Sequence, residues 1–323
     1  MKQTEGFLIK KQSRKLALRI GLCFSSIVII AACQPNTDRE KSSSDSMDRS
    51  VAQKDTANLQ SPEEKYELAR QKYEENTSDP DALIWYGRRA AYLGNYEEAI
   101  EIYSTGIERH PQDARLYRHR GHRYISTRQY DKAIQDLERA VDLIEDQEDK
   151  VEPDGLPNSR NIPLTTLHGN IWYHLGLAYY LKNDMDNALR AFSNRSVTVR
   201  YDDNIVSGAY WLYMILSRQG KTEEANAAIS KVHKDMDIIE NTSYHKMCLF
   251  YKGLIPETEL KSDDPKSSSG NVYSYGLGNW YLFEKQDTLQ AKKYYDPLLE
   301  NGNKYSFAYL AAESDWERIF QDS

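Results

Sequence analysis

The sequence predicts an all-α fold, a solenoid of stacked helix-turn-helix units, because a short pattern recurs along it at a fixed spacing. Gly87 and Gly121 lie 34 residues apart, and so do Tyr96 and Tyr130. The same order of residues returns from Gly176, after an insertion. A period of this length with small residues at fixed positions indicates paired antiparallel helices, stacked unit on unit. Small residues are needed where two helix backbones approach closely.

One unit carries the pattern most completely. If it begins at Gly169, its positions 4, 8, 11, 20 and 24 hold Trp172, Gly176, Tyr179, Ala188 and Phe192. At these positions tetratricopeptide repeats favour an aromatic residue, Gly, Tyr, Ala and a second aromatic residue, so the chain resembles that family. The resemblance implies a right-handed superhelix in which the first helix of each unit lines a concave surface.

The repeat pattern divides the body of the chain, residues 61–323. A helix begins after Ser61, where Ser, Pro and Glu in succession form a typical start signal. Units are expected near 80–113, 114–147, 169–202, 206–239 and 272–305, with a separate helix over 244–253. A last helix, from Tyr305 to Phe320, is expected to cap the stack. Its solvent-exposed face is expected to carry Glu313, Asp315, Glu317 and Arg318.

An insertion, residues 145–165, interrupts the spacing between the second and third units. It opens with acidic residues and contains three prolines, so no helix is expected to continue through it. Two interpretations remain open. The insertion is a surface loop, or it is a flap that folds over the concave surface or contacts a partner.

The first 32 residues resemble a bacterial signal peptide. Six Lys and Arg residues precede or flank an apolar run, Ile20 to Ile30, that would rise only about 16 Å as a helix. This is too short for a hydrocarbon core of about 30 Å, so cleavage is favoured over a membrane span. The residues Ile30 to Cys33 resemble the lipobox, which implies that Cys33 receives a diacylglyceryl group. The alternative is an ordinary secretory signal in which Cys33 is incidental.

Residues 33–60 are expected to form a disordered, lipidated tether, because this segment has almost no large apolar residue. Its reach is roughly 30 Å. Removal of the signal would change the formal net charge from −7 to −12. Such an acidic body argues against nucleic-acid binding, so the membrane is expected to be reached through the N-terminal lipid. Gln34 lacks the aspartate that retains lipoproteins in the inner membrane of enteric bacteria, which favours the outer membrane.

No motif for catalysis or for a cofactor is found, so an enzyme is not expected. His119 and His122 are three residues apart on one expected helix, close enough to share a metal ion. Arginines surround them, and no acidic or cysteine ligand lies nearby to complete a set. A metal site is therefore not expected either.

The family resemblance also implies a peptide-binding groove on the concave surface. The groove positions of the first four units hold Arg88, Tyr92, Arg115, Arg118, His122, Tyr173, Tyr180, Tyr210 and Arg218. Among these positions Asp81 is the one acid, and the arginines are expected to be exposed to solvent. Arginine forks suit carboxylates, so an acidic, extended peptide segment would fit. The alternative is that these arginines serve solubility and are neutralised by acids on neighbouring helices.

Two functions follow. The favoured one is a scaffold or adaptor that binds protein partners in the bacterial envelope through its repeats. The alternative is a cell-surface lipoprotein that binds a solute or glycan, which would require an enclosed aromatic pocket instead of an open groove.

We predict that Cys33→Ala releases the protein from membranes or leaves it unprocessed, because the thiol is the acceptor of the lipid. Membrane fractionation and electrophoretic mobility measure the two effects. If both are unchanged in the variant, Cys33 is not lipidated.

Overall fold

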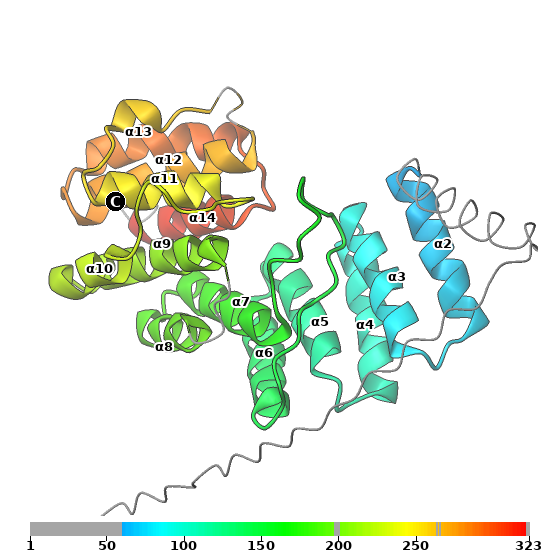
Figure 1. Cartoon of the computed structure of the whole chain (residues 1–323). Coiled ribbons are helices and arrows are strands. Elements are labelled where there is room, and N and C mark those ends of the chain that lie inside the picture. The colour runs from blue at the N-terminus through cyan, green and yellow to red at the C-terminus, as the bar shows by residue number, and fades with distance from the viewer. Residues whose placement is uncertain (1–59, 197–200, 263, 265, 321–323) are drawn as a thin grey trace, which may run out of the picture. The chain divides into compact units, whose positions relative to one another are not determined.

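The computed structural model describes residues 60–196, 201–262, 264 and 266–320, which form helices joined by loops and turns (Figure 1). Within this part of the chain, extended pairing is limited to one isolated bridge, between Val151 and Thr166. The predicted all-α class is confirmed. The signal peptide, Cys33 and the tether up to residue 59 lie outside the described residues. No described helix is long and apolar enough to cross a bilayer.

Most helices are arranged as antiparallel pairs that follow one another along the chain. The helix α2 (Pro62–Glu75) precedes the first pair. The pairs are α3 (Pro80–Tyr92) with α4 (Tyr96–Arg109), α5 (Ala114–Ser126) with α6 (Tyr130–Ile144), α7 (Leu167–Leu181) with α8 (Met185–Arg195), α9 (Asp202–Arg218) with α10 (Thr222–Ile229), and α12 (Ser268–Phe283) with α13 (Thr288–Asn301). The helix α11 (Thr242–Tyr251), the 3₁₀ turn η2 (Glu257–Glu259) and α14 (Phe307–Ile319) complete the fold.

Side-chain caps explain where several helices begin. Ser61 and Glu64 form the expected capping box at the start of α2. The helices α9 and α12 each begin four residues before the start that the repeat pattern gives, at Asp202 and Ser268. For α12 the cause is Ser267, whose hydroxyl accepts the N–H of Gly270 and so caps an additional turn.

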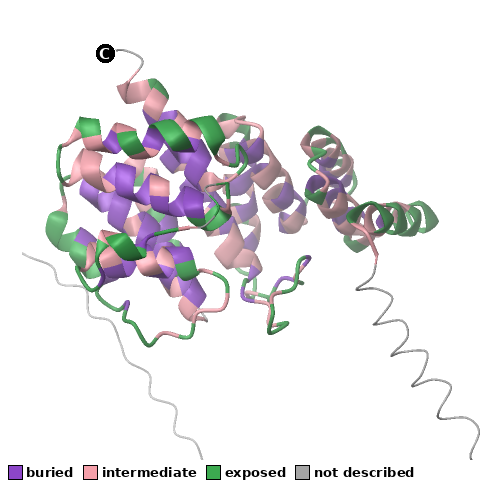
Figure 2. Cartoon of the chain, turned by 90° about the horizontal axis from the view of Figure 1, so that it is seen from above, coloured by how far each residue is buried: buried purple, intermediate pink, exposed green. Residues whose placement is uncertain are grey.

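Close approach at a glycine sets the packing inside each pair. A Cβ atom at Gly176 would lie 2.6 Å from ring carbons of Phe192. The same distance separates a Cβ at Gly87 from Tyr103 and one at Gly278 from Tyr295. No real Cβ tolerates such a contact, so the large side chain of the second helix lies directly on the backbone of the first. Buried residues accordingly gather on the helix faces that touch one another (Figure 2).

The last helix does more than cap the end of the stack. It packs against α7, α12 and α13, so it returns to the first helices of earlier units. At its start, the ring of Phe307 lies 5.5 Å from that of His122 and 5.8 Å from that of His174. Just before it, the rings of Tyr305 and Tyr96 are 4.9 Å apart. The residues 305–319 therefore reach across the concave side of the repeats.

One residue of α14 departs clearly from the sequence expectation. Asp315 was expected on the solvent-exposed face, but it is 0% exposed. This prediction is wrong because the helix is covered on both sides, by α12 and α13 and by the earlier repeats. A buried carboxylate needs a partner, and Arg218 of α9 supplies it.

We predict that Gly176→Leu lowers the melting temperature clearly, because the new side chain must displace Phe192, which is buried. Overpacking of this kind costs about 1–3 kcal/mol. Ser193→Leu is the matched control, since it adds the same side chain at an exposed position of α8. Equal melting temperatures for the two variants would show that the assigned repeat register is wrong.

Candidate functional site

The nine predicted groove residues fall into two groups. Five come from α3 and α5, and they are Arg88, Tyr92, Arg115, Arg118 and His122. Four come from α7 and α9, and they are Tyr173, Tyr180, Tyr210 and Arg218. The structure gives these groups different surroundings.

The α7 and α9 group does not line an open groove, and that part of the prediction is wrong. Tyr180 is 1% exposed and Tyr210 is 0% exposed. The hydroxyl groups of Tyr180 and Tyr275 are 2.6 Å apart, and Tyr210 donates to the backbone oxygen of Val272 at 3.4 Å. Both contacts are made with α12, so the concave side of these units is filled by later helices of the same chain.

Arg218 is likewise engaged within the protein. Its guanidinium, 4% exposed, forms a forked ion pair with Asp315, with one N–O distance of 2.8 Å. Tyr275 and Tyr295 also donate to this carboxylate. Burial alone would lower the pKa of Arg218, but Asp315 and the nearby tyrosines more than offset it and raise the pKa well above its usual value. The pair holds α14 against α9 and leaves no arginine free for a partner at this point.

Tyr173 lies between these regions. Its ring packs edge-on against Phe192 at 5.7 Å, and its hydroxyl accepts the indole N–H of Trp211 at 3.0 Å. A nearby cation, Arg195, lies 4.9 Å from the ring centroid. These contacts are those of a core residue, so Tyr173 belongs to the packing of α7 against α8 and α9.

The α3 and α5 group faces the insertion, residues 145–165, which lies in front of α5 in Figure 1. Hydrogen bonds join this insertion, called the flap below, to both α3 and α5. Arg88 donates to the backbone oxygen of Pro153 at 2.9 Å, and Arg89 donates to that of Gly155 at 3.2 Å. The structure thus decides between the two interpretations of the insertion. It is the flap over the concave surface.

An ion pair holds the centre of the flap. Arg118 donates to the carboxylate of Glu152 at 2.8 Å, and the two side chains are 11% and 10% exposed. Asn170 of α7 donates to the same carboxylate. Arg118 was expected to be solvent-exposed, and that prediction is wrong because Glu152 covers it. Glu152, the acid that neutralises Arg118, belongs to the insertion. The groove positions are defined within the repeats, so they do not include it.

The two ends of the flap are fixed as well. At the base of the flap, the backbone N–H of Glu152 donates to the backbone oxygen of Thr165 at 3.0 Å. The N–H of Leu167 donates to the backbone oxygen of Lys150 at 2.8 Å. Farther out, Arg160 forms a forked pair with Asp237 at 2.8 Å, in the segment between α10 and α11. The insertion is therefore anchored to three separate parts of the fold.

Arg115 lies at the outer end of α5 and is paired with acids. It contacts Asp113 at 2.6 Å and Asp81 at 2.5 Å. For Arg115 the interpretation in which neighbouring acids neutralise the groove arginines is the one the structure supports.

A small basic cavity lies on α3, α4 and α5. Its volume is about 130 Å³. The charged and polar side chains around it are those of Arg88, Tyr92, Tyr103, Arg118, His119, His122 and Arg123. Three predicted groove arginines and histidines, Arg88, Arg118 and His122, thus meet at one place.

Arg123 and His119 were missed at the sequence level as members of this site. They occupy positions 10 and 6 of the second unit, whereas the groove positions carried over from the family are 2, 5, 9, 12 and 13. Helical spacing could have found them, because His119 and Arg123 are four residues apart and share a face of α5.

The histidines of the cavity are held neutral. Burial first, and then the charges of Arg118 and Arg88, lower the pKa of His119 well below its usual value. Burial and Arg123 do the same to the pKa of His122. The ring of His174 lies 4.2 Å from that of His122, and its pKa is also lowered by burial and by Arg118. Positive charge at the cavity therefore comes from the arginines.

No group of three His, Cys, Asp or Glu side chains in the described part of the chain is arranged to hold a metal ion. The pair of His122 and His174 has arginines around it in place of carboxylates. A dication would be repelled there.

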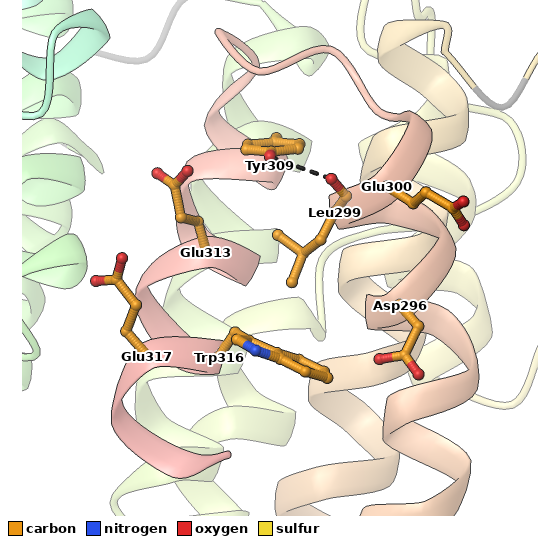
Figure 3. A pocket seen from close by; sticks show the side chains of 7 residues that line it. All are labelled: Asp296, Leu299, Glu300, Tyr309, Glu313, Trp316 and Glu317. Carbon is orange, nitrogen blue, oxygen red and sulfur yellow. Dashed lines mark hydrogen bonds between the residues drawn. The ribbon is translucent and has the colours of Figure 1, made fainter. Parts of the chain in front are cut away.

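A larger hollow lies between α13 and α14 (Figure 3). Its volume is about 450 Å³, and Asp296, Glu300, Glu313 and Glu317 surround the side chains of Leu299, Tyr309 and Trp316. The ammonium group of Lys292 lies 3.9 Å from the Trp316 ring centroid. One tryptophan with a face already covered is not the enclosed aromatic pocket that the glycan-binding alternative requires.

Comparison with known proteins agrees with the repeats seen in the structure. Tetratricopeptide repeat models match residues 87–148 and residues 169–193. These segments include α4, α5 and α6 and most of α7 and α8, so this part of the chain contains tetratricopeptide repeats.

Two solved structures are among those similar to this chain. The MamA RS-1 ArsTM double mutant is 18% identical with a TM-score of 0.43, and the match covers 59% of this chain and 93% of that one. YrrB, described as a TPR protein with an unusual peptide-binding site, is 18% identical with a TM-score of 0.41. That match covers 77% of this chain and 99% of the other. No curated protein matches the sequence.

We predict that Glu152→Gln loosens the flap while the helices stay folded, because a neutral amide cannot offset the charge of Arg118. Amide hydrogen exchange should accelerate at Glu152 and Leu167, whose N–H groups form the base of the flap. Glu148→Gln makes the same chemical change at an exposed position and is the control. Identical exchange in both variants would show that the ion pair does not hold the flap.

Proposed function

We propose that this chain is a bacterial envelope lipoprotein, anchored through Cys33, whose repeats act as a protein-interaction scaffold. Its concave surface at α3 and α5 binds an extended, acidic segment of a partner protein. The lipid provides the membrane attachment, and the outer membrane is favoured over the inner one. The protein needs neither a cofactor nor a catalytic group for this role.

The flap carries the proposal, since residues 152–155 form an acidic, non-helical segment on this surface. Arg88 and Arg89 bind its backbone oxygens, and Arg118 binds its carboxylate. Hydrogen bonds to backbone oxygens bind an extended chain whatever its side chains are, whereas the ion pair requires an acidic side chain in the bound segment. A partner segment of the same chemistry would use the same donors.

Charge distribution supports the same conclusion. The chain carries a formal net charge of −7, yet Arg88, Arg89, Arg118 and Arg123 are grouped on α3 and α5. A basic patch on an acidic protein directs acidic partners to one face and repels them elsewhere. Partner affinity should therefore fall as salt rises.

The choice of variant follows from the contacts. Replacing Arg118 would leave the buried Glu152 carboxylate without its cationic partner, so a loss of binding could reflect misfolding. Arg88 and Arg89 contact backbone oxygens of the flap instead, so replacing them leaves no buried charge without a counter-charge. The double variant Arg88→Ser, Arg89→Ser is therefore the informative one.

We predict that crosslinking and pull-down from native membranes recovers one stoichiometric protein partner. The double variant should bind it at least about tenfold more weakly, since charge-assisted hydrogen bonds are worth roughly 1.5–3 kcal/mol each. Arg70→Ser, Arg190→Ser removes the same charge from exposed positions outside the concave surface and is the control.

Partner binding that is the same in the double variant and in the control, and that ignores salt, would contradict the proposal. Failure to recover any protein partner, together with thermal stabilisation by a glycan, would support the solute-binding alternative instead.

A further inference from the structure

The small cavity on α5 is lined by residues that contact parts of the chain far apart in sequence. On one side is the flap, where a Cβ at Gly155 would lie 2.1 Å from the Tyr92 hydroxyl. On the other side is Phe307, at the start of α14, whose ring contacts that of His122. Tyr92 and His122, which line the cavity, are thus each in contact with a segment from another part of the chain.

Positive charge in the cavity exceeds the negative charge that the chain supplies. The guanidinium groups of Arg88, Arg118 and Arg123 line it, and Glu152 provides one carboxylate, on Arg118. The acids of this region nearest the start of α5, Asp81 and Asp113, are paired with Arg115 instead. Cations that are partly removed from water without a counter-charge are costly.

Hydrogen-bond donors are also left over. Among the described residues none accepts a hydrogen bond from the Arg123 guanidinium, which lies 5.3 Å from the ring centroid of Tyr96. Burial lowers the pKa of Arg123, as expected for a cation without an acidic neighbour. The Nε of Arg118 is buried and has no partner either. Of these donors it is the Arg118 Nε that is shut off from solvent, and a buried donor without a partner calls for a ligand or a water molecule.

Size restricts the ligand. A volume of about 130 Å³ is well below the roughly 300–1,000 Å³ that sites for drug-sized ligands usually span. This favours a small group, such as a single tetrahedral or planar oxyanion, over a nucleotide or an oligosaccharide.

We propose that the cavity formed by Arg88, Arg118 and Arg123 binds one oxyanion group of the phosphate or carboxylate type. The forked donors of the arginines match the oxygens of such a group, and its charge offsets theirs. The group is either a free anion or a carboxylate side chain of the partner segment. The second source rests on the function proposed above, and the first does not.

The test uses the full-length, processed protein in detergent, with inorganic phosphate as the first probe and sodium chloride at matched ionic strength as the reference. Phosphate should bind saturably by calorimetry and raise the melting temperature beyond the effect of chloride. The imidazole resonances of His119 and His122 should shift along the same titration, whereas those of His233 and His245 should not.

Arg123→Gln should weaken phosphate binding at least tenfold. Arg70→Gln, which removes a charge on the exposed face of α2, should leave it unchanged. Because Arg123 forms no ion pair with a described residue, its replacement is expected to preserve the helical circular dichroism. The histidine resonances of the unsubstituted protein give a reading that does not depend on the folding of the variant.

A second arm separates the two sources. A capped tripeptide with one central glutamate, Gly-Glu-Gly, is titrated in place of phosphate. Phosphate binding without peptide binding assigns the cavity to a free anion, and competition between the two assigns it to a carboxylate side chain. Binding of neither probe, or equal binding by Arg123→Gln and the parent, would overturn the proposal. Neither result depends on whether a protein partner is recovered from membranes.

Discussion

The contact between a glycine on the first helix of a unit and a large side chain on the second is the constraint on which the fold depends. At Gly87, Gly176 and Gly278 a ring occupies the space of a Cβ. This contact fixes how far apart the helices lie and how each is rotated about its axis. The rotation decides which residues of α3, α5, α7 and α9 face the concave side.

The concave side is covered differently in two parts of the chain. Over α7 and α9 it becomes core, because α12 and α14 cover it and Arg218 meets Asp315 there. Over α3 and α5 it is covered by the flap, which is held mainly by arginine side chains, and a small cavity lies on the same helices. A buried ion pair with tyrosine donors is suited to permanent packing. A thin flap held by a few arginine side chains is suited to exchange with a ligand.

The sequence correctly predicted those features that depend on contacts between the two helices of one repeat. The period located the helix pairs because small and large residues must alternate at fixed positions, as at Gly176 and Phe192. It failed for Tyr180, Tyr210 and Arg218 because no repeat rule states that helices 62 to 97 residues later return to cover them. The composition of the insertion predicted a break in the helices, but the arginines that it contacts are known only from the folded chain.

The return of α14 to the early repeats changes how the protein is expected to unfold. In an open solenoid each repeat touches only its neighbours, so the ends can fray one repeat at a time. Here Arg128 pairs with Glu313, 185 residues away, and Arg318 donates to Leu181, 137 residues away. Closing such long loops is entropically costly and slows folding. Once formed, these links join the α5–α6 pair to the C-terminal helices, so α5 through α14 are expected to melt as one cooperative unit.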